Sequence, residues 1–100
     1  MDNTKELIEL IRAGAQMDSE QISDAIELFL YDNVLYDVGE NGDAIYQTII
    51  KIDNDNEEEL YSIYMVHNDM WGTEPDDEYF FTRVYPKEIK TIAYVKKEEL

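Results

Sequence analysis

Cysteine is absent from this 100-residue chain, and histidine occurs only once, as His67. Without cysteine the chain forms neither a disulfide framework nor a thiolate metal site, which suits a protein of the reducing cytosol. The sequence also lacks an apolar run near the roughly 20 residues that a transmembrane helix needs, and its first residues lack the basic and apolar regions of a signal peptide. We therefore expect a cytoplasmic protein.

The groups on which most enzymes depend are scarce. His67 is the only imidazole, and Ser19, Ser23 and Ser62 lie outside any Gly-x-Ser-x-Gly context that would expose a nucleophile. With four glycines, the chain contains no phosphate-binding loop and no dinucleotide fingerprint. Pairs of carboxylates are inevitable among 24 acidic residues, so such pairs do not indicate acid–base catalysis. The sequence predicts a protein that is not an enzyme and uses no cofactor.

One stretch has a partial likeness to a calcium-binding loop. Asp53, Asp55 and Glu57 occupy the alternating acidic positions with which such a loop opens. The sixth position, where the loop needs glycine for a sharp turn, holds Glu58 instead. We therefore predict no specific metal site.

Basic residues are few and unevenly placed, and the formal net charge is -16. Residues 13–82 contain 18 acids and a single base, Lys51, whereas residues 83–100 contain five bases and three acids. Such a surface repels nucleic acid and anionic membranes and attracts basic proteins over a Debye length of about 8 Å. The plain alternative is a solubility coat, although a net charge of magnitude about 2 to 8 normally suffices for that in a small domain.

Apolar content of 44% in 100 residues indicates one folded domain that spans residues 1–100. The first part predicts two amphipathic helices. One ends near Gly14, and the other begins at Asp18 or Ser19, carries Tyr31 on its outer face and stops near Asn33.

The remainder of the chain predicts antiparallel strands. Runs rich in apolar, β-branched and aromatic residues cover 34–38, 44–52, 60–67, 79–85 and 89–95. Pro86 is expected to mark the end or the edge of a strand, and 68–78 to form a long connection. Helices followed by strands indicate an α+β fold, with the two N-terminal helices packed on a four- to five-stranded antiparallel sheet. Apolar residues on both faces of the middle strands require helices on one side and a loop or a partner on the other.

Acidic residues gather in three clusters, which we predict to bind a basic partner. The tip cluster, between the two central strands, comprises Asp53, Asp55, Glu57, Glu58 and Glu59. The helix cluster comprises Glu20, Asp24 and Glu27, and the loop cluster comprises Glu74, Asp76, Asp77 and Glu78. We expect the tip cluster to make the main contact and the helix cluster the second.

Aromatic side chains supply two further candidates for the same surface. Eight Tyr, one Trp and three Phe are an enrichment, and Tyr and Trp both anchor interfaces and line small cores. We predict Tyr31, beside the helix cluster, and Trp71 as exposed anchors; a lid over the sheet edge is the alternative role of Trp71.

In size, charge, lack of cysteine and order of elements, the chain resembles a class of small acidic phage and mobile-element proteins that inhibit DNA-binding enzymes by imitating DNA. The class includes several anti-CRISPR proteins and the uracil-DNA glycosylase inhibitors. The resemblance rests on no residue motif, so it transfers no functional residue, and the basic segment 83–100 departs from a uniformly acidic surface.

The resemblance implies a non-enzymatic inhibitor in the cytoplasm of a host cell. Its partner would be a basic DNA- or RNA-binding host protein, with a Cas9-type CRISPR effector as the leading target, and it would bind neither nucleic acid nor membranes directly. Two alternatives stay open: an immunity protein or antitoxin that neutralises a basic nuclease toxin, and a small acidic metal-dependent enzyme.

Overall fold

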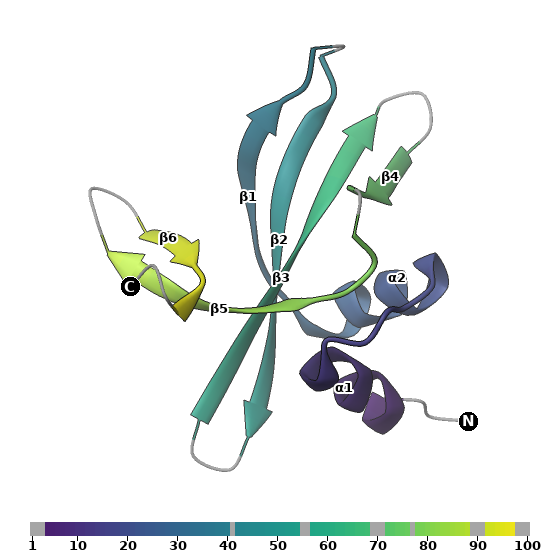
Figure 1. Ribbon diagram of the computed structural model, residues 1–100, viewed down its shortest axis with the longest axis vertical. Coiled ribbons are helices and arrows are strands. Elements are labelled where there is room, and N and C mark those ends of the chain that lie inside the picture. The colour runs from purple at the N-terminus through teal and green to yellow at the C-terminus, as the bar shows by residue number, and fades with distance from the viewer. Residues whose placement is uncertain are drawn as a thin grey trace.

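Two helices precede a curled antiparallel sheet in the computed structural model (Figure 1). The structure describes residues 4–40, 42–54, 57–68, 72–76, 78–88 and 92–97. The elements are α1 (Thr4–Ala13), α2 (Ser19–Phe29), β1 (Leu30–Val38), β2 (Ala44–Asn54), β3 (Glu57–Asn68), β4 (Gly72–Pro75), β5 (Thr82–Glu88) and β6 (Ile92–Val95). The predicted α+β architecture is confirmed. The described sheet has six strands, because β4 occupies part of the expected connection 68–78.

The predicted boundary between the helices is also confirmed. Gly14 follows α1 with a φ of 64°, and its N–H donates to the carbonyl of Ile11 at 3.2 Å, which closes the last turn. Asp18 caps α2 with a reciprocal pair of bonds. Its carboxylate accepts from the Gln21 N–H at 2.8 Å, and the Gln21 side chain accepts from the Asp18 N–H at 2.9 Å.

The end of α2 differs from the prediction of a stop near Asn33. The helix ends at Phe29, and the next residue, Leu30, already pairs with Ile50 of β2. The Leu30 N–H still bonds the Ile26 carbonyl, while its ψ of 126° turns the chain into an extended strand. Pairing with β2 therefore overrides the local helical pattern, and Tyr31 lies on β1 instead of on α2. The first strand has nine residues and is longer than the expected 34–38.

The sheet is built around the β2–β3 hairpin. The strand order is β1-β2-β3-β5-β6, and β4 pairs with the end of β3 that β5 leaves free. The β2–β3 ladder runs from Ala44 opposite His67 to Asn54 opposite Glu57. Within the acidic stretch 53–59, residues 53–54 and 57–59 are thus strand, and Asp53 pairs with Glu58, whereas their turn-forming side chains predicted a polar tip. Residues 55–56 lie outside the described residues.

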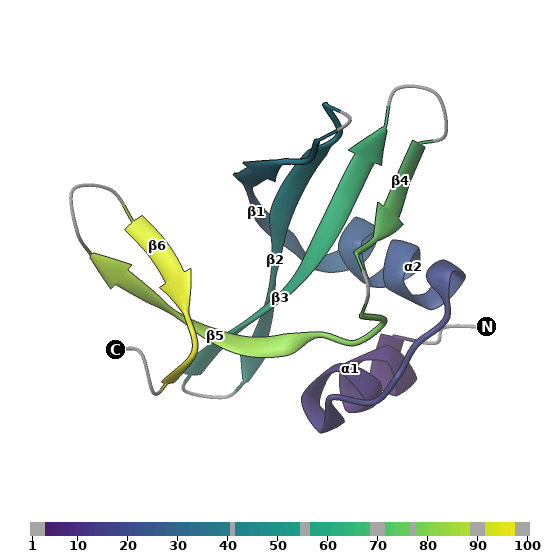
Figure 2. The ribbon, with the colours of Figure 1, turned by 45° about the horizontal axis from the view of Figure 1, so that its top comes forward.

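Apolar residues pack on both faces of the central strands, as expected. The helix-side core consists of Leu7, Ile11, Met17, Ile22, Ala25, Ile50, Ile52, Tyr61, Ile63, Met65 and Phe81. The opposite face has a smaller core of Ile49, Leu60 and Val84, with Tyr94 of β6 packed against it. The shield on this second face is the β5–β6 arm, which bends away from the plane of β2 and β3 (Figure 2).

Pro86 lies within β5, which continues to Glu88 and pairs there with β6. Past Val84, β6 is the only described strand that pairs with β5, so the missing N–H of proline falls where the sheet has an edge. Strand β5 begins at Thr82, three residues later than the predicted run 79–85, and β6 covers the described part of the predicted run 89–95, of which residues 89–91 lie outside the described residues. Neither described helix has the length and apolar character needed to cross a membrane.

Candidate protein interaction site

Glu59, a member of the predicted tip cluster, is held inside the fold. The residue is 8% exposed, and its carboxylate accepts hydrogen bonds from the Arg12 Nε at 2.8 Å and the Tyr61 hydroxyl at 3.0 Å. The bond to Glu59 raises the pKa of Arg12, and burial together with the same carboxylate raises the pKa of Tyr61. Glu59 thus joins α1 to the sheet, and we exclude it from the contact surface.

The neighbouring glutamates of the tip cluster are compensated by bases. Glu57 Oε1 lies 3.1 Å from a guanidinium nitrogen of Arg83, and Glu58 Oε1 lies 3.8 Å from Lys51 Nζ. Asp53 is exposed and has no ion pair with another described residue, while Asp55 lies outside the described residues. The stretch with the highest density of acids therefore carries less uncompensated charge than its sequence suggests.

Arg83 also contacts two aromatic rings. Its guanidinium carbon is 5.6 Å from the ring centre of Tyr61 and 4.9 Å from that of Tyr85. Burial acts to lower the pKa of Arg83, but the hydrogen bond that Arg83 donates to Glu57, together with the neighbouring tyrosines and Glu59, raises it above its usual value. The arginine is fixed in the fold by these contacts and offers little free charge to a partner.

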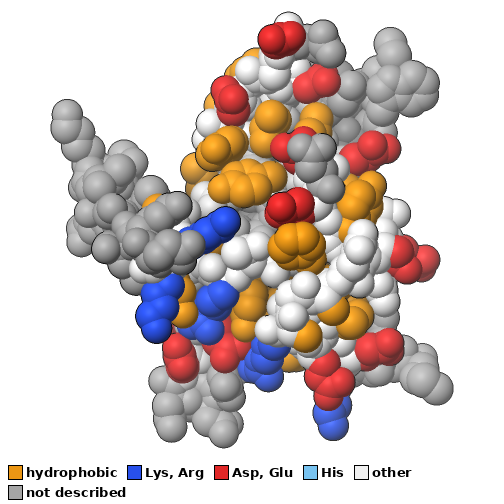
Figure 3. All heavy atoms as spheres, in the orientation of Figure 1, with side chains coloured by type: hydrophobic (Ala, Val, Ile, Leu, Met, Phe, Trp, Pro, Cys, Tyr) orange, Lys and Arg blue, Asp and Glu red, His pale blue; other side chains and the backbone are white. Residues whose placement is uncertain are grey.

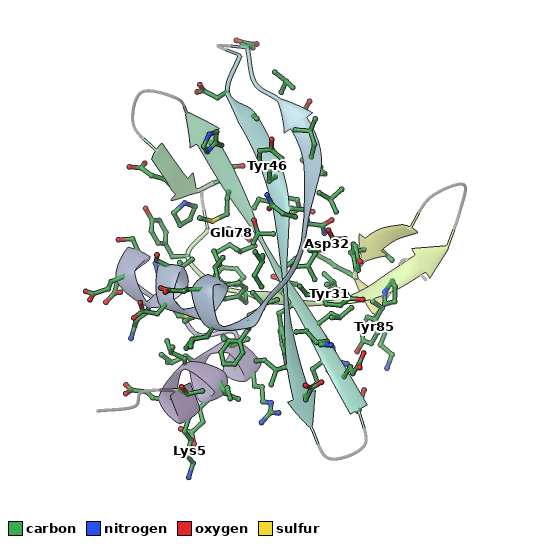
Figure 4. All side chains as sticks on the ribbon, turned by 180° about the vertical axis from the view of Figure 1, so that it is seen from behind. Lys5, Tyr31, Asp32, Tyr46, Glu78 and Tyr85 are labelled. Atoms are coloured by element: carbon green, nitrogen blue, oxygen red, sulfur yellow. The ribbon has the colours of Figure 1, made fainter. Side chains whose placement is uncertain are left out.

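The helix cluster and the loop cluster lie on neighbouring elements. Figures 1 and 2 both show β4 above α2 and the segment from β4 to β5 passing beside that helix. The Met17 N–H fixes this segment by donating to the Tyr79 carbonyl at 2.7 Å. Glu78 is labelled just above α2 in Figure 4. The fold therefore brings together acids that are about 50 residues apart in the chain.

A groove lies between α2 and the segment that includes β4 and Tyr79. Its volume is about 510 Å³, and it is lined by Ser19, Ile22, Ser23, Ile26, Met65, Glu74, Pro75 and Tyr79. Glu20, Asp24 and Glu27 follow one another at helical spacing on the stripe of α2 next to the lining residues. Among the described acids of the two clusters, Glu74 alone lines the groove, beside apolar residues such as Ile22 and Met65. An apolar lining with an acid at its border suits a Lys or Arg side chain, because such a side chain joins an apolar stem to a charged head.

The carboxylates around this groove form no ion pair with any other described residue. Glu20, Glu27, Glu74 and Glu78 are exposed, and Asp24 is partly buried. Asp76 is partly buried, and its N–H donates to the Tyr64 carbonyl at 2.8 Å, which anchors the segment to β3. Asp77 lies outside the described residues. We define the acidic groove as the helix cluster, Glu74, Asp76 and Glu78.

Charge is segregated on the face of the molecule shown in Figure 3. On the face shown in Figure 3, Lys and Arg side chains gather around the β5–β6 arm and below it. The upper part of that face, over β1, β2 and β3, carries hydrophobic and acidic side chains. A basic partner would therefore be attracted to one part of the surface and repelled from another.

Tyr31, which was predicted as an anchor beside the helix cluster, does not lie on α2. Tyr31 is 50% exposed, but it lies on β1, where its ring centre is 5.2 Å from Lys51 Nζ. Trp71 lies outside the described residues.

Sequence reasoning missed the exposed apolar side chains at the end of α2 and along β1. They are Leu28 (52%), Leu30 (55%), Leu35 (55%), Tyr36 (63%) and Val38 (56%). The available signal was the run of apolar and aromatic residues from position 28 onwards, which the helical pattern before it concealed.

Among the described residues, no group of three or more His, Asp and Glu side chains is arranged to hold a metal ion. Comparison of the chain with protein-family models, with curated proteins and with solved structures found no match.

Proposed function

We propose that this protein is a non-enzymatic inhibitor that binds the basic nucleic-acid-binding surface of a DNA-processing enzyme in place of DNA. One observation carries the proposal. Three bases of the central body, Arg12, Lys51 and Arg83, pair with the glutamates of β3, whereas the acids of the acidic groove pair with no described base. Carboxylates that are not paired with bases, and that a rigid fold holds in place, can bind a basic protein surface in place of DNA phosphates.

The spacing of these carboxylates supports imitation of a nucleic-acid backbone. With a rise of about 1.5 Å per residue, Glu20, Asp24 and Glu27 stand roughly 6 and 4.5 Å apart along the axis of α2. Each DNA strand carries one phosphate charge per about 3.4 Å of helix axis. The helix cluster, together with Glu74, Asp76 and Glu78 on the neighbouring segment, therefore supplies a comparable density of negative charge.

The target that we propose is a Cas9-type effector, the leading target implied by the resemblance described above. Such an effector holds its guide–target duplex in a positively charged channel and recognises the backbone of that duplex. The basic segment 83–100 limits the imitation to one side of the inhibitor, so we propose contact through the acidic groove with the β5–β6 arm turned away.

Competition with DNA tests this function directly. A Cas9-type effector loaded with guide RNA is mixed with fluorescently labelled target duplex, and the anisotropy of the label is followed as the protein is added. We expect displacement of the duplex, and we expect the inhibitor to bind less tightly as salt rises, because screening weakens contacts between opposite charges.

Absence of displacement at saturating protein would contradict the proposal for this target. A parallel pull-down from a lysate, with the proteins identified by mass spectrometry, separates a wrong target from a wrong function. Capture of a basic nuclease toxin would support the immunity-protein alternative, and turnover of a substrate by the protein alone would overturn the non-enzymatic assignment.

A further inference from the structure

Strand β1 is an edge strand whose outer side is open. It pairs with β2 from Leu30 opposite Ile50 to Val38 opposite Ala44, and no described strand pairs with its other side. All nine residues of β1 are exposed except Val34, which is partly buried. Natural proteins usually shorten or cover such an edge, because its free N–H and C=O groups are a template for another strand.

Apolar side chains project from both faces of this edge. Leu35 and Val38 lie opposite Tyr46 and Ala44 on β2, and each is more than half exposed. Tyr36 is 63% exposed and packs on Tyr64 of β3 with 4.7 Å between ring centres. A strand added beside β1 would cover these side chains on both faces. Monomeric proteins rarely expose contiguous apolar side chains, so their exposure here favours a binding role.

Two aspartates of β1 accept hydrogen bonds from backbone N–H groups of the same strand. The Asp32 carboxylate accepts from the Asn33 N–H, and the Asp37 carboxylate accepts from the Val38 N–H, each at 2.8 Å. Because these N–H groups bond to side chains of their own strand, we assign them to the outer side of β1. The β1–β2 register is irregular immediately before each aspartate, between Leu30 and Asp32 and between Leu35 and Asp37.

The aspartates determine which strand can bind. A neutral strand meets donors that are already satisfied, and an acidic strand is repelled. A second copy of this chain is also repelled, because it has a net charge of -16 and would bring its own Asp32 and Asp37 against the same edge. A strand with Lys or Arg on it pairs with the two carboxylates and draws them away, which frees the Asn33 and Val38 N–H groups for backbone hydrogen bonds.

We propose that β1 is a docking edge that takes an extended basic segment of a partner protein as an additional strand of the sheet. The recognition is β-augmentation, in which main-chain bonds provide the pairing and side chains provide the selection. The inference does not depend on the proposed function, since it concerns another element of the surface and another mode of binding.

A synthetic peptide tests the docking edge. The probe alternates Lys and Val over about ten residues, enough to follow a nine-residue strand at about 3.3 Å per residue. Amide hydrogen exchange of the full chain is measured by NMR with and without this peptide. We expect exchange at Asn33 and Val38 to slow about tenfold or more when the peptide is bound. The control peptide has the same sequence and charge with N-methyl groups on alternate residues, which block strand pairing, and it should give no such protection.

Variants identify the carboxylates that select the peptide. The double variant D32K/D37K should weaken binding of the Lys-Val peptide about tenfold or more, whereas the matched reversal E6K/E9K on α1 should change it by less than about threefold. Circular dichroism checks that both variants fold. The proposal is overturned if the N-methylated peptide protects β1 equally, if protection maps to the acidic groove alone, or if sedimentation shows that β1 protection arises from a dimer of this chain.

Discussion

Arg12 of α1 and Glu59 of β3, which are 47 residues apart in the chain, meet at 2.8 Å across the helix-side core. Glu59 also accepts a hydrogen bond from the hydroxyl of Tyr61. An acid from the most acidic stretch of the sequence thus holds a helix on the sheet, and at 8% exposure it offers little surface to a partner. The interaction separates the structural acids of this protein from those that remain available for binding.

Removal of this carboxylate should destabilise the fold. We expect Glu59→Ala to lower the free energy of unfolding by about 1 to 3 kcal/mol, because it leaves the Tyr61 hydroxyl without its buried acceptor and Arg12 without its anion. The Arg12 side chain is 39% exposed, and water compensates it in part. Urea denaturation followed by circular dichroism measures the change.

Glu58→Ala is the matched control for that experiment. The Glu58 side chain is 67% exposed and lies 3.8 Å from Lys51, so its loss should cost less than about 0.5 kcal/mol. Equal effects of the two substitutions would contradict the structural role assigned to Glu59.

Alkaline pH should weaken the fold through two tyrosines. Burial raises the pKa of Tyr61 and Tyr94 above the ordinary value of 10.0, and the neighbouring carboxylates of Glu59 and Asp32 add to the effect. The folded state therefore holds both phenolic protons more tightly than the unfolded state does. Their contribution to stability is complete below the unfolded pKa and is lost as pH rises through the folded pKa.

The double variant Tyr61→Phe/Tyr94→Phe checks this linkage. We expect the free energy of unfolding of the parent to fall more steeply above pH about 10 than that of the variant, because phenylalanine has no proton to lose. The measurement is urea denaturation at a series of alkaline pH values. Parallel pH profiles for the two proteins would exclude a role for these two phenols.

Salt should stabilise the folded chain. The net charge of -16 is repulsive in the compact state, and the described ion pairs compensate only a few of the 24 acids. Thermal unfolding is compared at about 0.01 M and about 1 M NaCl, between which the Debye length falls from about 30 to about 3 Å. A rise in Tm is the expected result, and a fall in Tm on addition of salt would show that local ion pairs outweigh the overall repulsion.

Local sequence signals predicted the ends of those elements that residues close together in the chain determine. The Gly14 stop and the Asp18 cap are local backbone features, and both have the predicted form. The end of α2 was not predictable in this way, because the pairing of Leu30 with Ile50 decides it and that contact depends on a strand far along the chain.

The candidate site was predictable only in part for the same reason. The helix and loop clusters are visible in the sequence, but the groove depends on how the segment after β4 lies against α2. Conversely, the tip cluster has the highest density of acids, and its compensation by Arg12, Lys51 and Arg83 follows only from the three-dimensional arrangement. Charge counted along a chain therefore overestimates the charge that a partner meets.

Charge reversal in the competition assay is the most direct test of the account. The helix variant E20K/D24K/E27K and the control E6K/E9K/D53K each replace three exposed or partly exposed acids by lysine, so they change the net charge of -16 equally. If the acidic groove replaces the phosphates of DNA, the helix variant should compete about 100-fold less well for the Cas9-type effector, while the control changes by less than about threefold. Equal competition by the two folded variants and the parent would contradict the account and would leave the acids as a solubility coat.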